Sequence, residues 1–213
     1  DSWEERSQQM VNGDTVWIWR RNINAAGEEI KPTEVCFRIQ ALIRNIDPIV
    51  AFKCLKDPDI RKSWDLKMAD LKLIEEDDSE QKKYYVIKSN LPFVSDRDVV
   101  VRQQSRENFP KEGSYVYAFT SCDHSDYPES EDFIRTSNHF TGYKFSPAPE
   151  MKGTWMEWIQ NIDVNGGIPG FVFKYAGEKM QLKTFMQMKG GFLKEQKRKE
   201  EKSPRWIKML YGD

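Results

Sequence analysis

The chain has 213 residues, with 33 Lys and Arg against 34 Asp and Glu, so its formal net charge is −1. A nearly neutral chain lacks the positive surplus that nucleic-acid-binding proteins use, so we expect no nucleic-acid partner. Its 12 Phe, 7 Trp and 8 Tyr can fill a sizeable core, which excludes global disorder. Chains of this length commonly fold as one unit, and we expect a single domain over residues 1–213.

The first third of the chain predicts a mixture of helices and strands. Trp3 and Met10 stand among polar residues and suggest a short N-terminal helix that packs on the domain. Asp47-Pro48 combines a cap residue with a proline at the first helical position, which starts a helix. Further along, strands are predicted at residues 15–20 and 34–43, and helices at residues 47–56 and 58–65.

From residue 70 onward, strand patterns dominate, separated by Pro, Gly, Asn or Asp. The predicted strands are residues 70–74, 84–88, 98–105, 114–120, 133–145 and 154–163. Consecutive strands at hairpin spacing predict an antiparallel sheet.

Pro169 opens a long helical stretch to about residue 195. Glu178 and Lys189 interrupt its main apolar face, which consists of Phe171, Tyr175, Leu182, Phe185, Met186 and Leu193. A helix of this length can cross a whole curved sheet, so the fold class is α+β, with enclosed space between helix and sheet.

The chain has an odd number of cysteines, Cys36, Cys54 and Cys122, and none of them has CxxC spacing. This pattern favours reduced thiols in a cytoplasmic setting over disulfides or a zinc site. We expect neither a metal nor a cofactor.

Four short motifs follow one another: RKSWD at 61–65, YYVIK at 84–88, LPFVSDRD at 91–98 and NGGIP at 165–169. In this order they resemble the START (steroidogenic acute regulatory protein-related lipid transfer) domain, closest to its phosphatidylcholine transfer protein branch. The resemblance covers almost the whole chain. It implies a helix-grip fold, in which a curved antiparallel sheet is closed by a long C-terminal helix around a hydrophobic tunnel that takes one lipid.

Arg61 and Asp65 are four residues apart on a predicted helix, so their side chains can pair. The residues alone are equally those of a surface salt bridge worth under about 1 kcal/mol. The resemblance implies instead that Arg61 lies in the tunnel, where its guanidinium suits a lipid phosphate and Asp65 holds it in place. Trp64 between them is expected in the core.

The resemblance also points to three positions where phosphatidylcholine binders place groups around the choline. Tyr85 matches the first, whereas Val99 and His139 occupy the second and third. A quaternary ammonium needs several ring faces around it, so this set favours a phospholipid or another amphipath over choline in particular. Tyr85 is alternatively a plain core residue, and His139 is either a head-group partner or a histidine without a role in binding.

Leu91-Pro92-Phe93-Val94 is an apolar connection between two strands, which is unusual because connections run over the surface. The segment either folds inward onto the final helix or forms a gate whose tip enters a membrane, as the resemblance implies. Ile168 and Phe171, at the start of the final helix, are expected to move with it or to contact the membrane.

We therefore expect a cytoplasmic, monomeric domain that binds one lipid and exchanges it during transient, peripheral membrane contact. No nucleophile elbow, zinc-protease motif or P-loop is present, so we expect no enzymatic activity. Two alternatives stay open: a lipid sensor that transfers nothing, and an enzyme that uses the same cavity, as polyketide cyclases of similar fold do.

Overall fold

The computed structural model describes residues 3–11, 13–24, 27–77, 79–89, 94–167 and 170–202, with the backbone alone over 170–178. The described strands form one sheet in the order β1-β2-β3-β10-β9-β7-β6-β5-β4, and the short β8 pairs in parallel with β6. All other neighbours are antiparallel, and β1 and β4 remain as edges, so the sheet does not close into a barrel. The strand bounds are β1 Glu4–Val11, β2 Asp14–Arg20, β3 Glu34–Arg44, β4 Met68–Glu76, β5 Gln81–Ile87, β6 Arg97–Glu107, β7 Tyr115–Ser121, β8 Ile134–Arg135, β9 Ser137–Ala148 and β10 Gly153–Asp163.

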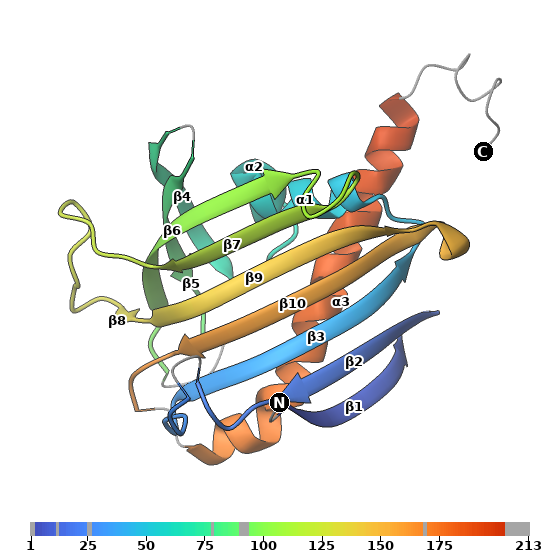
Figure 1. The fold of residues 1–213 in the computed structure, drawn as a ribbon. Helices are drawn as coiled ribbons and strands as arrows, with labels where there is room; N and C mark the ends of the chain where they lie inside the picture. Colours follow the sequence, from blue (N-terminus) through green and yellow to red (C-terminus); the bar gives the residue numbers. More distant parts are fainter. Residues whose placement is uncertain are drawn as a thin grey trace.

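The helices lie on one side of this curved sheet (Figure 1). They are α1 (Pro48–Lys56), α2 (Pro58–Lys62) and α3 (Gly170–Lys202), and a 3-10 turn, η1, covers Pro149–Met151. Helix α3 crosses behind the sheet, and α1 packs against both α3 and the central strands β7, β9 and β10. We call the sheet face that meets these helices the inner face. The α+β helix-grip architecture is thus confirmed.

The N-terminal segment departs from the prediction, because it forms strand β1 and not a helix. It pairs with β2 from Glu4↔Arg20 to Val11↔Asp14. The sequence Asn12-Gly13 between these strands is a typical hairpin signal, and Gly13 has a φ of +85°. This turn signal outweighs the spacing of Trp3 and Met10, which suggested a helical face.

The main core lies between the inner face and the C-terminal half of α3. Phe185, Met188 and Phe192 of α3 are fully buried there, against inner-face residues such as Tyr143 and Phe145. A second, smaller cluster lies toward the β4 edge and consists of Leu71, Tyr85, Val99 and Val101. Phe119 packs against both clusters, so polar groups between them are surrounded by apolar side chains.

Helix α3 buries only part of the predicted apolar face: Phe185 is buried and Leu182 packs against the core, as expected. Met186 and Leu193 are exposed, whereas Lys189 is buried. A straight helix that crosses a sheet obliquely buries a narrow stripe at i, i+3, i+4 and i+7, and here that stripe runs from Phe185 through Met188 to Phe192.

Candidate ligand-binding site

The candidate site begins at the junction of α1 and α2. Both helices meet at Asp57, whose Oδ1 accepts hydrogen bonds from the backbone N–H groups of Asp59 (2.9 Å) and Ile60 (3.1 Å). After α2 ends, the N–H of Asp65 still donates to the carbonyl oxygen of Arg61 at 3.0 Å. One more helical turn therefore keeps Arg61 and Asp65 on one face, as predicted.

Arg61 and Asp65 form a close, largely buried ion pair. Nε and Nη2 of Arg61 both lie 2.8 Å from Oδ2 of Asp65, and the N–H of Lys67 donates to Oδ1 at 3.2 Å. The side chains are 15% and 10% exposed, so this is no ordinary surface pair. Burial disfavours the Arg61 cation, but the Asp65 carboxylate and the neighbouring tyrosines together outweigh that effect and raise the pKa of Arg61.

Three tyrosines surround this pair from three strands of the inner face. Tyr85, Tyr117 and Tyr143 are all buried and act electrostatically on Arg61. The hydroxyls of Tyr85 and Tyr117 lie 3.5 Å apart, and Tyr117 donates to Oε1 of Gln103 at 2.9 Å. Burial raises the pKa of each tyrosine, so all three hydroxyls stay neutral and offer both donors and acceptors. Such a cluster can bind a polar head group inside an otherwise apolar interior.

Trp64 occupies the core position that the sequence predicted. Its ring is buried, and its Nε1–H donates to the carbonyl oxygen of Cys54 at 3.1 Å. The Arg61 guanidinium lies 4.9 Å from the Trp64 ring centroid, so the tryptophan also supports the cation.

Lys83 is a site residue that the sequence analysis missed. Side chains alternate along β5, and Lys83 shares the inner face with Tyr85. Its Nζ donates to the carbonyl oxygen of Lys56, the last residue of α1, at 2.8 Å. Burial, followed by the charges of Lys56 and Arg61, lowers the pKa of Lys83 to about 8. The alternation of Lys83 and Tyr85 was the signal that could have identified it.

Of the remaining predicted contacts, the structure brings one to the cluster. Val99 lies directly opposite Tyr85 across the β5–β6 ladder and is buried beside it. His139 is 42% exposed, and its Nε2 lies 3.8 Å from Oε1 of Glu34, so it is not brought to Arg61. The cause is a bulge in β9. The consecutive residues Asn161 and Ile162 of β10 pair with Phe140 and Asn138 of β9, and the residue between them, His139, therefore falls outside the alternation that leads to Tyr143.

The predicted gate falls mostly outside the described residues. This applies to Leu91-Pro92-Phe93 and Ile168, and to the side chain of Phe171. Val94 is half-buried, and its carbonyl oxygen accepts a hydrogen bond from the Ser89 hydroxyl at 2.6 Å. Because the N–H of Ser89 also donates to Oδ1 of Asp96 at 3.0 Å, the two ends of this connection are held together.

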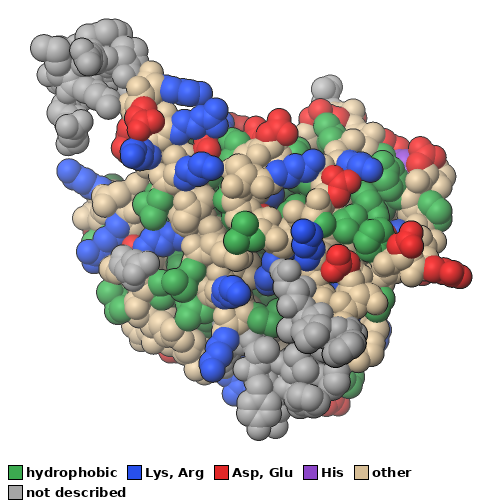
Figure 2. All heavy atoms as spheres, turned by 180° about the vertical axis from the view of Figure 1, so that it is seen from behind, with side chains coloured by type: hydrophobic (Ala, Val, Ile, Leu, Met, Phe, Trp, Pro, Cys, Tyr) green, Lys and Arg blue, Asp and Glu red, His purple; other side chains and the backbone are tan. Residues whose placement is uncertain are grey.

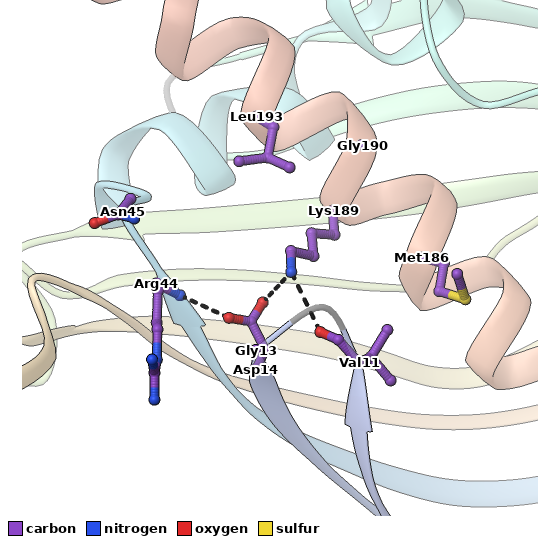
Figure 3. A pocket seen from close by; sticks show the side chains of 9 residues that line it. All are labelled: Val11, Gly13, Asp14, Arg44, Asn45, Met186, Lys189, Gly190 and Leu193. Atoms are coloured by element: carbon purple, nitrogen blue, oxygen red, sulfur yellow. Dashed lines mark hydrogen bonds and ion pairs between the residues drawn. The ribbon is translucent and has the colours of Figure 1, made fainter.

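A pocket of about 370 Å³ lies at the other end of the core, between the β1–β2 turn, the end of β3 and α3. Figure 3 shows Lys189 pointing to Asp14 and to the carbonyl oxygen of Val11 at the base of this pocket. Nζ of Lys189 lies 2.6 Å from Oδ2 of Asp14, and the N–H of Arg44 donates to Oδ1. Lys189 therefore has a structural partner, which explains a charge on the buried stripe of α3.

Two absences hold over the described part of the chain. No group of three or more His, Cys, Asp and Glu side chains there could hold a metal ion. No helix in the same residues has both the length and the hydropathy that crossing a membrane requires.

A curved antiparallel sheet crossed by a long C-terminal helix defines the helix-grip class of proteins. The family model of the START domain matches residues 37–199, and the chain belongs to the START domain family. A comparison with curated protein sequences finds no significant match.

Solved structures of low sequence identity share this fold. Human STARD10 aligns with a TM-score of 0.76 at 20% identity, over 94% of this chain and 77% of that one. Human StAR-related lipid transfer protein 5 also gives 0.76, at 17% identity over 91% and 87% of the two chains. The lipid transfer and protein localization domain of human StarD13 gives 0.70, at 16% identity over 89% and 88%. The relation to the phosphatidylcholine transfer protein branch stays a prediction.

Proposed function

We propose that the chain binds one phospholipid-type amphipath between the inner face and α3, and exchanges it at membranes. The observation that carries this proposal is the Arg61–Asp65 pair, shielded from water among the hydroxyls of Tyr85, Tyr117 and Tyr143. A guanidinium in such a place binds a phosphate strongly, because little water competes for its donors. Membership of the START family and the lipid-transfer names of its structural relatives support a lipid ligand.

Acyl chains and head group contribute differently in this proposal. Each CH₂ group that leaves water stabilises the complex by about 0.8 kcal/mol, so the chains dominate affinity. The polar cluster adds selectivity, since a head group that leaves Arg61 without an acceptor loses a charge-assisted hydrogen bond. The apolar cluster of Leu71, Val99 and Val101 beside Tyr85 supplies part of the wall that the chains need.

The outward stripe of α3 supports membrane contact. Met186 and Leu193 are exposed along one side of it and Met180 along the other, and at about 100° per residue Lys183 and Lys194 lie between them. Figure 2 shows Lys and Arg side chains among apolar ones on the face that carries α3. Such a surface can lie on an anionic lipid membrane, with its lysines at the head groups and the apolar side chains on either side of them at the acyl boundary.

We place this activity in the cytoplasm, with the protein acting as a monomer. The three cysteines are unpaired, which agrees with a reducing compartment. Opening of the connection at 91–94 and of the start of α3 near Ile168 and Phe171 would let the lipid pass.

The test is capture of lipid by purified protein incubated with mixed vesicles, followed by native mass spectrometry. The double substitution Arg61→Met/Asp65→Asn removes both charges of the pair together, so neither partner is left as an unpaired ion. We expect it to lower phospholipid occupancy about tenfold or more. Arg38→Met/Glu157→Gln is the matched control, because this pair joins at 3.2 Å on the opposite face of the sheet. The proposal fails if the unmodified protein captures no lipid, or if both double variants behave alike.

Movement of labelled lipid between donor and acceptor vesicles separates transfer from sensing. A transfer protein accelerates this movement, whereas a sensor binds lipid and leaves the rate unchanged. Chemical change of the bound lipid would instead support an enzyme.

A further inference from the structure

Lys83 is buried without a carboxylate partner. Lys83 is only 1% exposed. Within the described part of the chain, no carboxylate lies at ion-pair distance from its Nζ, which donates to a backbone carbonyl oxygen. Fully buried lysines are rare unless they are paired, because an ammonium loses its hydration on burial. The carbonyl oxygen of Lys56 satisfies one of its three N–H groups. Lys189, which is also buried, does have a carboxylate partner, Asp14.

The charges around Lys83 leave the site positive. Arg61, Lys67 and Lys83 supply three cations, and Asp65 is the carboxylate in contact with Arg61. Nζ of Lys67 lies 3.3 Å from the hydroxyl of Thr184 on α3 and so has a neutral partner.

More distant carboxylates do not remove this surplus. Asp57 and Glu76 act on Lys83 less strongly than the cations Lys56 and Arg61 do. The Asp57 carboxylate is also engaged with the first N–H groups of α2.

We propose that Lys83 is a second anion-binding side chain beside Arg61, and that the lipid held here carries a net negative head group. This inference rests on the proposed function and narrows its ligand class. An added anion would give Lys83 the partner it lacks and reduce the positive surplus. A choline head group would bring a further positive charge to the same place. Val99, an aliphatic residue, stands beside Tyr85 where a second ring would be needed to hold that charge.

A purely structural role makes a different prediction. As a cation at the C-terminus of α1, Lys83 stabilises the helix through its free carbonyl groups. In that case its replacement would change stability and leave head-group preference unchanged.

The experiment offers the protein equimolar phosphatidylglycerol and phosphatidylcholine with the same acyl chains in mixed vesicles. The captured ratio is read by native mass spectrometry at pH 7. We expect phosphatidylglycerol to be favoured about tenfold by the unmodified protein. Lys83→Met should lower this ratio to about threefold or less, and Lys83→Gln, which keeps a donor near Lys56, should do the same. Lys82→Met is the matched control, since Lys82 is the adjacent residue on the opposite face, paired with Glu75.

The outcomes distinguish the two proposals. A ratio near one in the unmodified protein overturns this inference and leaves lipid binding intact, whereas capture of no lipid overturns the proposed function itself. An unchanged ratio in a folded Lys83 variant assigns Lys83 to helix capping. Inorganic phosphate that protects the protein from thermal unfolding as well as phosphatidylglycerol does would overturn the lipid as source of the anion.

Discussion

The two ends of the core solve the problem of a buried lysine in opposite ways. At one end, Asp14 and Lys189 neutralise each other, and the backbone of Val11 and Arg44 completes their hydrogen bonds. At the other end, Lys83 rests on a helix carbonyl beside the Arg61–Asp65 pair, and the local charge is positive. The difference teaches that burial of a charge does not by itself distinguish a ligand site from a structural ion pair, and our proposal uses the balance of the buried charges to separate the two.

The comparison is tested most severely by removing one carboxylate from each end. Asp65→Asn leaves Arg61 without its partner, and Asp14→Asn does the same to Lys189. Each should lower the free energy of unfolding by about 3–5 kcal/mol in lipid-free protein, measured by urea titration. Added phosphatidylglycerol should restore part of the loss in Asp65→Asn and none in Asp14→Asn. Equal rescue of both variants would mean that the two ends do not differ as we propose.

The pH dependence of stability gives the next largest effect. Because the pKa of Lys83 is lowered from 10.5 to about 8, the unfolded chain binds more protons between these values, and stability rises with pH across that window. Lys83→Met removes this slope, so it should exceed the unmodified protein by about 1–3 kcal/mol at pH 7 and lose that advantage near pH 10.5. Urea titrations at pH 7, 8.5 and 10 measure the difference. Lys82→Met should retain the slope, and a parallel pH profile in Lys83→Met would contradict the buried-charge assignment.

Two neighbouring glycines of α3 sharpen the picture of how the helix is fixed between the two ends. A Cβ at Gly191 would lie 2.5 Å from Cγ of the buried Trp64, whereas a Cβ at Gly190 would meet nothing within 4 Å. Gly191→Ala should therefore destabilise by about 1–3 kcal/mol, and Gly190→Ala should stabilise by about 0.5–1 kcal/mol. Thermal unfolding of both variants checks this, and the same sign for the two would show that α3 does not rest on Trp64 as described.

The smallest effect is expected at an exposed pair on α3. Nζ of Lys199 lies 2.5 Å from Oδ2 of Asp47, and both side chains are about half exposed. Solvent screens such a pair, so Lys199→Ala should change the free energy of unfolding by under about 0.5 kcal/mol. A larger loss in urea titration would mean that partly exposed charges matter here more than the comparison of the buried ends assumes.

Local features of the site were predictable from sequence, and features assembled across the sheet were not. The Arg61–Asp65 pair needs a single helical turn, so a spacing of four residues was enough to predict it. Tyr117 and Tyr143 join that pair only because β7 and β9 are neighbours, which strand patterns cannot reveal. The resemblance pointed to His139, but a bulge in β9 takes this residue out of the alternation that leads to Tyr143, which no local pattern reveals.

The fold follows the same division. The alternation of apolar and polar residues predicted most strands and the antiparallel sheet. The hairpin of β1 and β2 was missed, although Asn12-Gly13 is a typical hairpin turn sequence. The long helix was predicted from its apolar residues, but its orientation depends on tertiary contacts. Lys189 is buried because it pairs with Asp14 on β2, 175 residues earlier in the sequence, and no local pattern predicts this contact.

The close contact between Gly191 and Trp64 holds α3 at one point, about which the N-terminal part of the helix can pivot. Trp64 and Cys54 together tie the α1–α2 corner to this point, since Sγ of Cys54 lies 3.8 Å from the carbonyl oxygen of Gly191. The arm from Gly191 back to Gly170 is roughly 30 Å long at 1.5 Å per residue. A bend of about 10° at the glycine pair would swing its far end by roughly 5 Å, which is about the width of an acyl chain, and would move the buried Phe185, six residues from Gly191, by under about 2 Å.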